Sequence, residues 1–231
     1  MRLGEFDGGD LGDVTDGFLQ DFNVAQDAVF LHEHYRASSK GGERSLFNDI
    51  ALIKLPTPAQ LNPRIGLVCL PLDPEEYKEE LEIQSFVSDL QGRRGALVGS
   101  GYTTDFDPWS GESKQDARNQ SIQWGGGVRI LNKDECNMAW ETLAGGQSSR
   151  IPHWSQVCAG GDERGDSCKW DSGSGLFVRN ERKEDTARWY LVGIHSFGSE
   201  TCKDGRPGIF TKVAEYIPWI KHGIDMLNQI N

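Results

Sequence analysis

The chain has 231 residues, and its 24 Lys and Arg side chains against 35 Asp and Glu give a net charge of −11, which argues against a nucleic-acid-binding protein. With 37% hydrophobic and 10% aromatic residues, it can bury a core as one large β domain or two small domains, and disorder and collagen-like repetition are excluded. No apolar run approaches the roughly 18 residues of a membrane-spanning helix, so no membrane partner is expected.

Short apolar stretches separated by polar, glycine-rich or proline-containing segments predict an all-β body. In chain order, the predicted strands cover residues 51–55, 66–70, 95–98, 127–130, 175–178 and 189–194. Only the C-terminus shows a helical period, with Pro218 near the first turn, where its missing N–H costs little. The apolar residues of this period are Val213, Ile217, Ile220, Ile224 and Leu227. We therefore expect the chain to end in one packed amphipathic helix.

The five cysteines stand at positions 69, 136, 158, 168 and 202, and none forms the C-x-x-C pairs typical of structural zinc sites. Two disulfides and one cysteine bonded to another polypeptide suit an oxidising compartment, although spacing alone does not give the pairing. Five reduced, buried thiols are the alternative. The first residues have no apolar segment followed by small residues, so they do not read as a secretory signal, which conflicts with oxidised cysteines.

The most informative segment, residues 165–175, reads GDSCKWDSGSG. A serine between an acidic residue and a glycine is weak evidence alone, because Ser and Gly also populate ordinary turns. Four further motifs strengthen it, and they are NDIALIKL at 48–55, VCAGG at 157–161, GIHSFG at 193–198 and PGIFTKV at 207–213. Together these motifs resemble the chymotrypsin/trypsin-like serine proteases. The resemblance spans essentially the whole chain, from RLGE at 2–5 to the terminal helix.

The resemblance implies an all-β fold of two six-stranded antiparallel β-barrels, with the active site in the cleft between them and a C-terminal α-helix. The chain is expected to form one trypsin-like domain over residues 1–231 that lacks its N-terminal strands. The incomplete first barrel would cover about residues 1–85. The second barrel and the helix would cover about residues 86–231.

The resemblance matches Ser172 to the nucleophile and Asp49 to the acid that orients the catalytic histidine. Both are needed because a serine hydroxyl is a poor nucleophile until an imidazole takes its proton, and a carboxylate fixes the tautomer of that imidazole. The backbone N–H groups of Trp170 and Ser172 match the oxyanion hole. Asp166 matches the acid at the base of the primary specificity pocket, which implies cleavage after Arg or Lys.

Further residues match the specificity pocket and the family's covalent links. Ser196, Phe197 and Gly198 match the segment against which the substrate backbone lies. The implied disulfides are Cys168 with Cys202 and Cys136 with Cys158. Cys69 matches the cysteine that tethers the protease domain to its pro-region. RLGEFD at 2–7 with a long acidic loop is most similar to arthropod clip-domain proteases of clotting and immune cascades, so the expected partners are a protein substrate or cascade partner and a clip domain or pro-region.

The main departure concerns the catalytic histidine. In the family it precedes the RLGE segment, inside an Ala-Ala-His-Cys motif, and this chain begins after that point. His32 and His34 fall in a surface strand and turn of the family. His195 stands where the family has a small apolar residue lining the specificity pocket. A bulky imidazole there is expected to narrow the pocket and to compete for Asp166.

The activation device and the nucleophile loop also depart from the family. Activation creates an N-terminal ammonium that pairs with the acid before the nucleophile, here Asp171, but the sequence has no Ile-Val-Gly-Gly start. Trp170, Ser174 and Gly175 replace the first, fifth and sixth residues of the family pattern Gly-Asp-Ser-Gly-Gly-Pro. Losing one oxyanion donor typically costs about a hundred- to a thousandfold in rate. We therefore expect no hydrolysis of Arg or Lys esters or amides by this polypeptide alone.

The first 27 residues hold seven acidic side chains, with Arg2 as the only base. Glu5 matches the start of a calcium-binding loop in some family members, and oxygen ligands such as Glu5 and Asp7 suit calcium. A solvated acidic loop is the favoured interpretation, because charge runs are usually exposed. No other cofactor is expected.

Two classes of function remain open from the sequence. The chain is either the bulk of a trypsin-like endopeptidase or a non-catalytic homologue that binds partners through the same cleft, and the fold cannot decide between them. An extracellular location is expected from the family and the cysteines.

Overall fold

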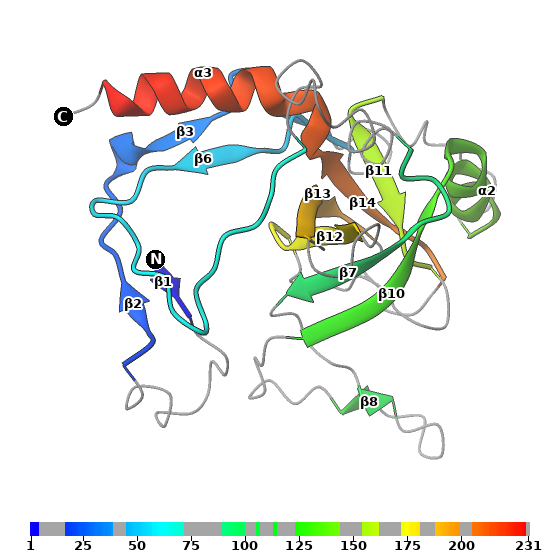
Figure 1. Ribbon diagram of the computed structural model, residues 1–231. Coiled ribbons are helices and arrows are strands. Elements are labelled where there is room, and N and C mark those ends of the chain that lie inside the picture. Colours follow the sequence, from blue (N-terminus) through cyan, green and yellow to red (C-terminus); the bar gives the residue numbers. More distant parts are fainter. Residues whose placement is uncertain are drawn as a thin grey trace.

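The computed structural model describes residues 1–4, 17–38, 45–71, 89–99, 105–106, 113–114, 123–143, 154–161, 172–180, 188–198 and 205–229. Its main feature is a closed antiparallel barrel with the strand order β10-β11-β14-β13-β12-β7 (Figure 1). In chain order these strands are β7 (Arg94–Gly99), β10 (Gln123–Leu131), β11 (Gln156–Ala159), β12 (Gly175–Asn180), β13 (Arg188–Phe197) and β14 (Gly208–Lys212). Closure pairs each strand of this barrel with two neighbours, so no edge is left open in it.

Alternate residues of the barrel strands fill its interior. Val128 and Ile130 of β10, Leu176 of β12 and Phe210 of β14 are at most 1% exposed. Residues two apart on a strand share a face, which is why these side chains converge. Burying an apolar side chain of this size contributes about 1.5–3 kcal/mol. At a bulge in β10, Gly127 adopts a φ of 88°, a backbone conformation that glycine reaches without strain.

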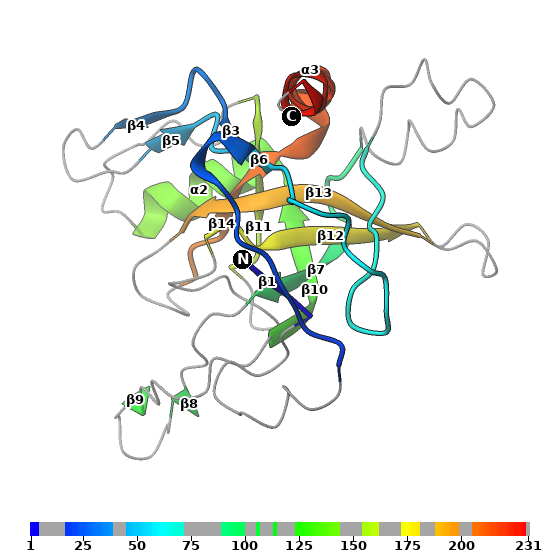
Figure 2. The ribbon, with the colours of Figure 1, turned by 90° about the vertical axis from the view of Figure 1, so that its left-hand side faces the viewer.

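The N-terminal part of the chain forms small two-stranded antiparallel sheets (Figure 2). The pairs are β1 (Arg2–Leu3) with β2 (Gln20–Asp21), β3 (Val29–Leu31) with β6 (Ala51–Ile53), and β4 (Arg36–Ser38) with β5 (Ser45–Phe47). A short 3-10 helix, η2 (Gln26–Ala28), precedes β3, and a separate pair joins β8 (Asp105–Phe106) to β9 (Ser113–Lys114). These N-terminal sheets are the incomplete barrel that the sequence predicted.

The chain ends in a 3-10 turn, η6 (Val213–Tyr216), and a helix, α3 (Ile217–Asn228), which runs alongside β3 and β6 (Figure 1). Trp219 stacks on Phe30 with ring centroids 5.4 Å apart. Gly223 lies so close to the sheet that a Cβ there would be 2.6 Å from a Leu52 methyl carbon. The predicted fold class, with one closed barrel, one incomplete barrel and a C-terminal helix, is confirmed. None of the helices in the described part of the chain is long and apolar enough to cross a membrane.

Two details of the predicted helix are wrong. Val213 belongs to the preceding 3-10 turn, and Ile224 is 47% exposed instead of packed. With 3.6 residues per turn, Ile220 and Leu227 lie on one face, and both are buried. Gly223 occupies this face between them, so Ile224 points away from it.

The predicted strand over residues 66–70 is absent from the structure. One isolated parallel bridge joins Cys69 to Tyr190 of β13. Leu67 is 86% exposed and Val68 is also exposed, so this apolar run does not mark a buried strand.

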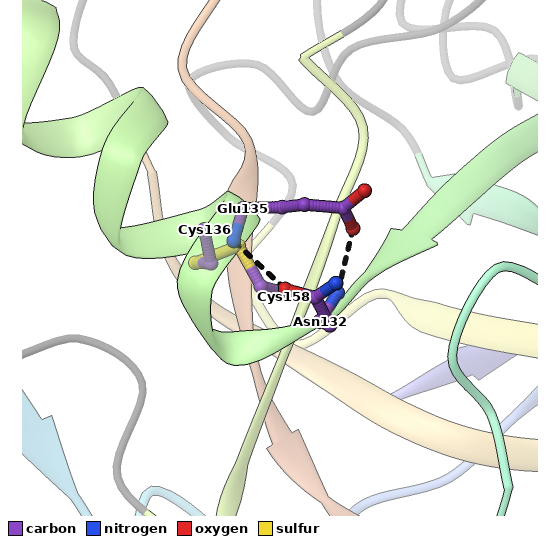
Figure 3. Close-up of a disulfide and its surroundings, with 4 residues drawn as sticks. All are labelled: Asn132, Glu135, Cys136 and Cys158. Carbon is purple, nitrogen blue, oxygen red and sulfur yellow. Dashed lines mark hydrogen bonds between the residues drawn. A yellow bond between two sulfur atoms is a disulfide. The ribbon is translucent and has the colours of Figure 1, made fainter.

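Helix α2 (Lys133–Leu143) was not predicted from the sequence. Its start is a capping box, in which each residue accepts a hydrogen bond from the other's backbone (Figure 3). Asn132 Oδ1 accepts the Glu135 N–H at 2.8 Å, and Glu135 Oε2 accepts the Asn132 N–H at 3.0 Å. Arg129 also donates to the Glu135 carboxylate at 2.6 Å. The backbone bond and Arg129 both hold the pKa of Glu135 below its usual range.

Replacing Asn132 by Ala should lower the free energy of unfolding by about 1 kcal/mol, because the Glu135 N–H loses its acceptor at the helix start. Asn132→Asp is the matched control, since it retains a side-chain acceptor and should lose much less. Denaturant unfolding followed by circular dichroism measures both. Equal stabilities for the two variants would show that this cap contributes nothing.

Candidate active site

Asp49 lies two residues before the start of β6 and is bonded to two strands of the closed barrel. Its carboxylate Oδ2 accepts a 2.6 Å hydrogen bond from Ser196 Oγ of β13, and its backbone carbonyl accepts a 2.8 Å bond from Thr211 Oγ1 of β14. Both donors are buried, at 4% and 3% exposed. The barrel therefore orients the half-buried Asp49 carboxylate, which can still accept donors at its remaining lone pairs.

Ser172 is exposed in the turn that precedes β12. The next residue, Gly173, has a φ of 86°, and its N–H donates to the His195 carbonyl at 2.8 Å. The His195 N–H donates in turn to the Ser174 carbonyl at 2.8 Å. Because Ser196 follows His195 in β13, the Ser172 turn is attached to the same strand end that orients Asp49. The structure thus brings the predicted nucleophile and the predicted acid to one end of β13.

The three residues predicted to face a substrate lie at the end of β13. The Ser196 hydroxyl is turned to Asp49, and Phe197 is buried against Ile209 and the disulfide of α2. Gly198 is half-buried. Since the Ser196 and Phe197 side chains are engaged inside the protein, contact with a substrate at these positions would fall to the backbone, and this role stays a prediction.

His195 is buried without a hydrogen-bond partner for either ring nitrogen among the described residues. It is 5% exposed and meets Phe210 edge-on, with ring centroids 5.0 Å apart. Burial lowers the pKa of His195 from 6.5 to about 4, so its imidazole is neutral near pH 7. Asp166, for which this imidazole was expected to compete, lies outside the described residues.

None of the four histidines in the described ranges bonds to Asp49, whose hydrogen-bond donors are Ser196 and Thr211. His32 instead stacks on Trp219 at 5.0 Å, and its Nδ1 accepts the His34 N–H at 3.1 Å. Burial lowers the pKa of His32. These contacts place His32 in the packing beneath α3.

The structure joins Cys136 of α2 to Cys158 of β11 by a disulfide (Figure 3), which is the pairing that the resemblance implied. Cys69 is half-buried and forms no disulfide with a described cysteine. The other predicted site residues fall outside the described ranges, and they are Glu5, Asp7, Asp166, Cys168, Trp170, Asp171 and Cys202. Within those ranges no group of three or more His, Cys, Asp or Glu residues is placed to hold a metal ion. Calcium binding at the acidic loop stays a prediction.

The chain matches a protein-family model, described as Trypsin, over residues 8–220. Among curated proteins, the CLIP domain-containing serine protease HP8 of Bombyx mori is 29% identical over 226 residues, which cover 95% of this chain and 52% of the relative. The CLIP domain-containing serine protease B4 of Anopheles gambiae is 29% identical over 97% of this chain and 54% of its own length. Phenoloxidase-activating factor 3 of Holotrichia diomphalia is 28% identical over 87% of this chain and 48% of its own. The chain therefore spans about half the length of these relatives.

The chain combines a closed antiparallel barrel with a second set of strands, and the Asp49 carboxylate is oriented where the two sets meet. This is the arrangement of β proteins that are built from two barrels. The match to the family model identifies the family within this class. The chain belongs to the trypsin family of serine proteases, and arthropod CLIP-domain serine proteases are among its curated relatives.

Proposed function

We propose that the chain is the main part of a trypsin-like endopeptidase that cleaves proteins after Arg or Lys. One observation carries the proposal, the 2.6 Å bond by which Ser196 orients the Asp49 carboxylate beside the Ser172 turn. In this proposal Asp49 holds an imidazole that takes the Ser172 proton, so that the oxygen can attack a peptide carbonyl. The N–H groups of Trp170 and Ser172 would bind the oxyanion, and Asp166 would pair with the substrate cation.

In this proposal, the 231-residue polypeptide does not hydrolyse substrates by itself. A catalytic imidazole must reach both Asp49 and Ser172, and none of the described histidines bonds to Asp49. Asp171 would also need an ammonium partner to assemble the oxyanion hole. The same observation favours a second candidate function, that of a non-catalytic homologue which binds a partner of a protease cascade through the cleft.

Relatives support an extracellular, cascade-linked role. One is named a phenoloxidase-activating factor, and another, from Tachypleus tridentatus, is named a clotting factor subunit. We propose that this chain likewise acts on, or binds, a protein of an extracellular proteolytic cascade. Cys69, which is half-buried and outside the described disulfide, would bond to a cysteine of a pro-region or clip domain.

The 231-residue chain should show no turnover of Arg or Lys esters above background, because a serine hydroxyl needs a base to become nucleophilic. The measurement compares this chain with Ser172→Ala, and turnover that disappears in the variant would contradict the proposed inactivity.

A fluorescent organophosphonate, applied to the activated full-length gene product, separates the two candidate functions. The endopeptidase should be labelled at Ser172 and the non-catalytic homologue should not. Ser174→Ala is the matched control, since it removes a serine from the same turn and should leave labelling intact. Labelling lost in Ser172→Ala but retained in Ser174→Ala supports the enzyme.

A further inference from the structure

Asn48, the residue before Asp49, has an unusual backbone. Its φ is 52°, and among the described residues it is the only one besides glycine with a positive φ. The left-handed conformation is costly for most residues, and Asn tolerates it better than most. The Ile50 N–H donates to the Asn48 carbonyl at 3.0 Å, so a three-residue turn encloses Asp49. This turn projects the Asp49 side chain from the corner before β6.

Both ends of the Asn48 side-chain amide are engaged by distant parts of the chain. Its Nδ2 donates to the His34 carbonyl at 2.9 Å, and its Oδ1 accepts the Tyr216 hydroxyl at 2.9 Å. Tyr216 is buried, at 4% exposed, and lies in η6 just before the C-terminal helix. Burial raises the pKa of Tyr216, so its hydroxyl keeps the proton that it donates.

We propose that Asn48 is a positioning residue for Asp49, anchored by the Tyr216 hydroxyl. The inference rests on the proposed function, in which Asp49 orients the catalytic imidazole. Ser196 and Thr211 hold the Asp49 side chain and carbonyl from the barrel. Asn48 supplies the third restraint, because its clamped amide and left-handed backbone fix the direction in which Asp49 leaves the corner.

The clamp links the corner to two other elements of the fold. The His34 turn belongs to the N-terminal sheets, and Tyr216 belongs to the C-terminal segment, 168 residues from Asn48 in sequence. A catalytic group misplaced by about 1 Å can cost about a hundredfold in rate. A displacement of the Tyr216 hydroxyl would therefore reach Asp49 through Asn48.

The proton of the Ser196 hydroxyl reports directly on the position of the Asp49 carboxylate. This readout works in the 231-residue chain and needs no enzymatic activity. A buried hydroxyl that donates at 2.6 Å to a carboxylate should give a slowly exchanging, downfield proton resonance, assigned by its loss in Ser196→Ala. Tyr216→Phe removes the anchor hydroxyl and with it a hydrogen bond to Ser155, and Asn48→Gly keeps the positive φ while removing only the amide. We expect both variants to shift or broaden this resonance.

Glu33→Ala is the matched control. Glu33 accepts a 3.1 Å bond from Trp219 Nε1, so it also ties the His34 turn to α3, but it does not touch Asn48. This variant should leave the Ser196 resonance in place. A resonance unchanged in Tyr216→Phe and Asn48→Gly, or one shifted equally by Glu33→Ala, would overturn the inference.

Turnover of the activated full-length product gives the second readout. Tyr216→Phe and Asn48→Gly should lower kcat by roughly tenfold to a hundredfold with little change in KM, since the clamp acts on Asp49 and not on substrate binding. An unmutated product without turnover would count against the proposed enzyme while the proton resonance still tests the clamp. Normal kcat in both variants would overturn the inference itself.

Discussion

Replacing Cys136 and Cys158 together by Ala should lower the free energy of unfolding by about 3 kcal/mol, the value expected for a disulfide that closes a loop over a sequence separation of 22. Cross-linking removes conformations from the unfolded chain, and both cysteines are fully buried between α2 and β11. Loss of the bond would also loosen the first turn of α2, which the capping box and the Arg129–Glu135 bond would then hold. Equilibrium denaturation under oxidising conditions measures the difference.

Cys69→Ala provides the control for this disulfide. It makes the same chemical change at a cysteine outside the described disulfide, so it should cost much less stability. Adding a reductant should lower the free energy of unfolding of the unmutated protein toward that of the double variant. If the double variant and Cys69→Ala unfold at the same denaturant concentration, the bond does not stabilise the fold.

Acidification should destabilise the protein through His195. Its pKa is about 4 in the folded state against an ordinary value of 6.5, so between these pH values the unfolded chain binds a proton that the folded protein does not. The contribution of His195 to the free energy of unfolding is therefore full above about pH 6.5, where the imidazole is neutral in both states. It decreases as the pH falls toward 4. The expected loss is about 3 kcal/mol, because the free energy of unfolding changes by about 1.36 kcal/mol for each pH unit between the two pKa values. Unfolding measured at several pH values gives the slope.

His195→Leu should flatten this dependence between pH 6.5 and 4, because no proton can be taken up at that position. Val192→Ala is the control, since it removes buried apolar volume from the same strand without a titrating group. It should lower stability equally at every pH and keep the slope. A His195→Leu variant whose slope equals that of the unmutated protein would show that another group causes the acid sensitivity.

The barrel could be predicted from sequence because its strands are half-buried and leave short apolar runs. The runs at 95–98, 127–130, 175–178 and 189–194 all fall in barrel strands. Helix α2 was not predicted, although Cys136, Trp140 and Leu143 recur at helical spacing along its sequence. The Asn132-x-x-Glu135 pattern was the signal that could have revealed its start.

The candidate site could be predicted only in part. Motifs pointed to Asp49 and Ser172, because each sits in a short, characteristic run of residues. Thr211 donates to the Asp49 carbonyl, and Tyr216 acts on Asp49 through Asn48. Motifs could not predict these two roles. They depend on contacts between residues 162 and 168 positions apart, which no local pattern encodes.

These large sequence separations also determine when the Asp49 site can form during synthesis. The Asp49 carboxylate gains its orientation from Ser196, 147 residues later, and its carbonyl is held by Thr211, 162 residues later. A ribosome-bound chain that has not yet extruded β13 and β14 therefore carries Asp49 without these restraints, however well its local strands have formed. Contacts of such high sequence separation form late and slowly. The acid is therefore oriented only after β13 and β14 have been synthesised and have folded, and a chain cut short before Ser196 would lose this orientation although the sequence around Asp49 is untouched.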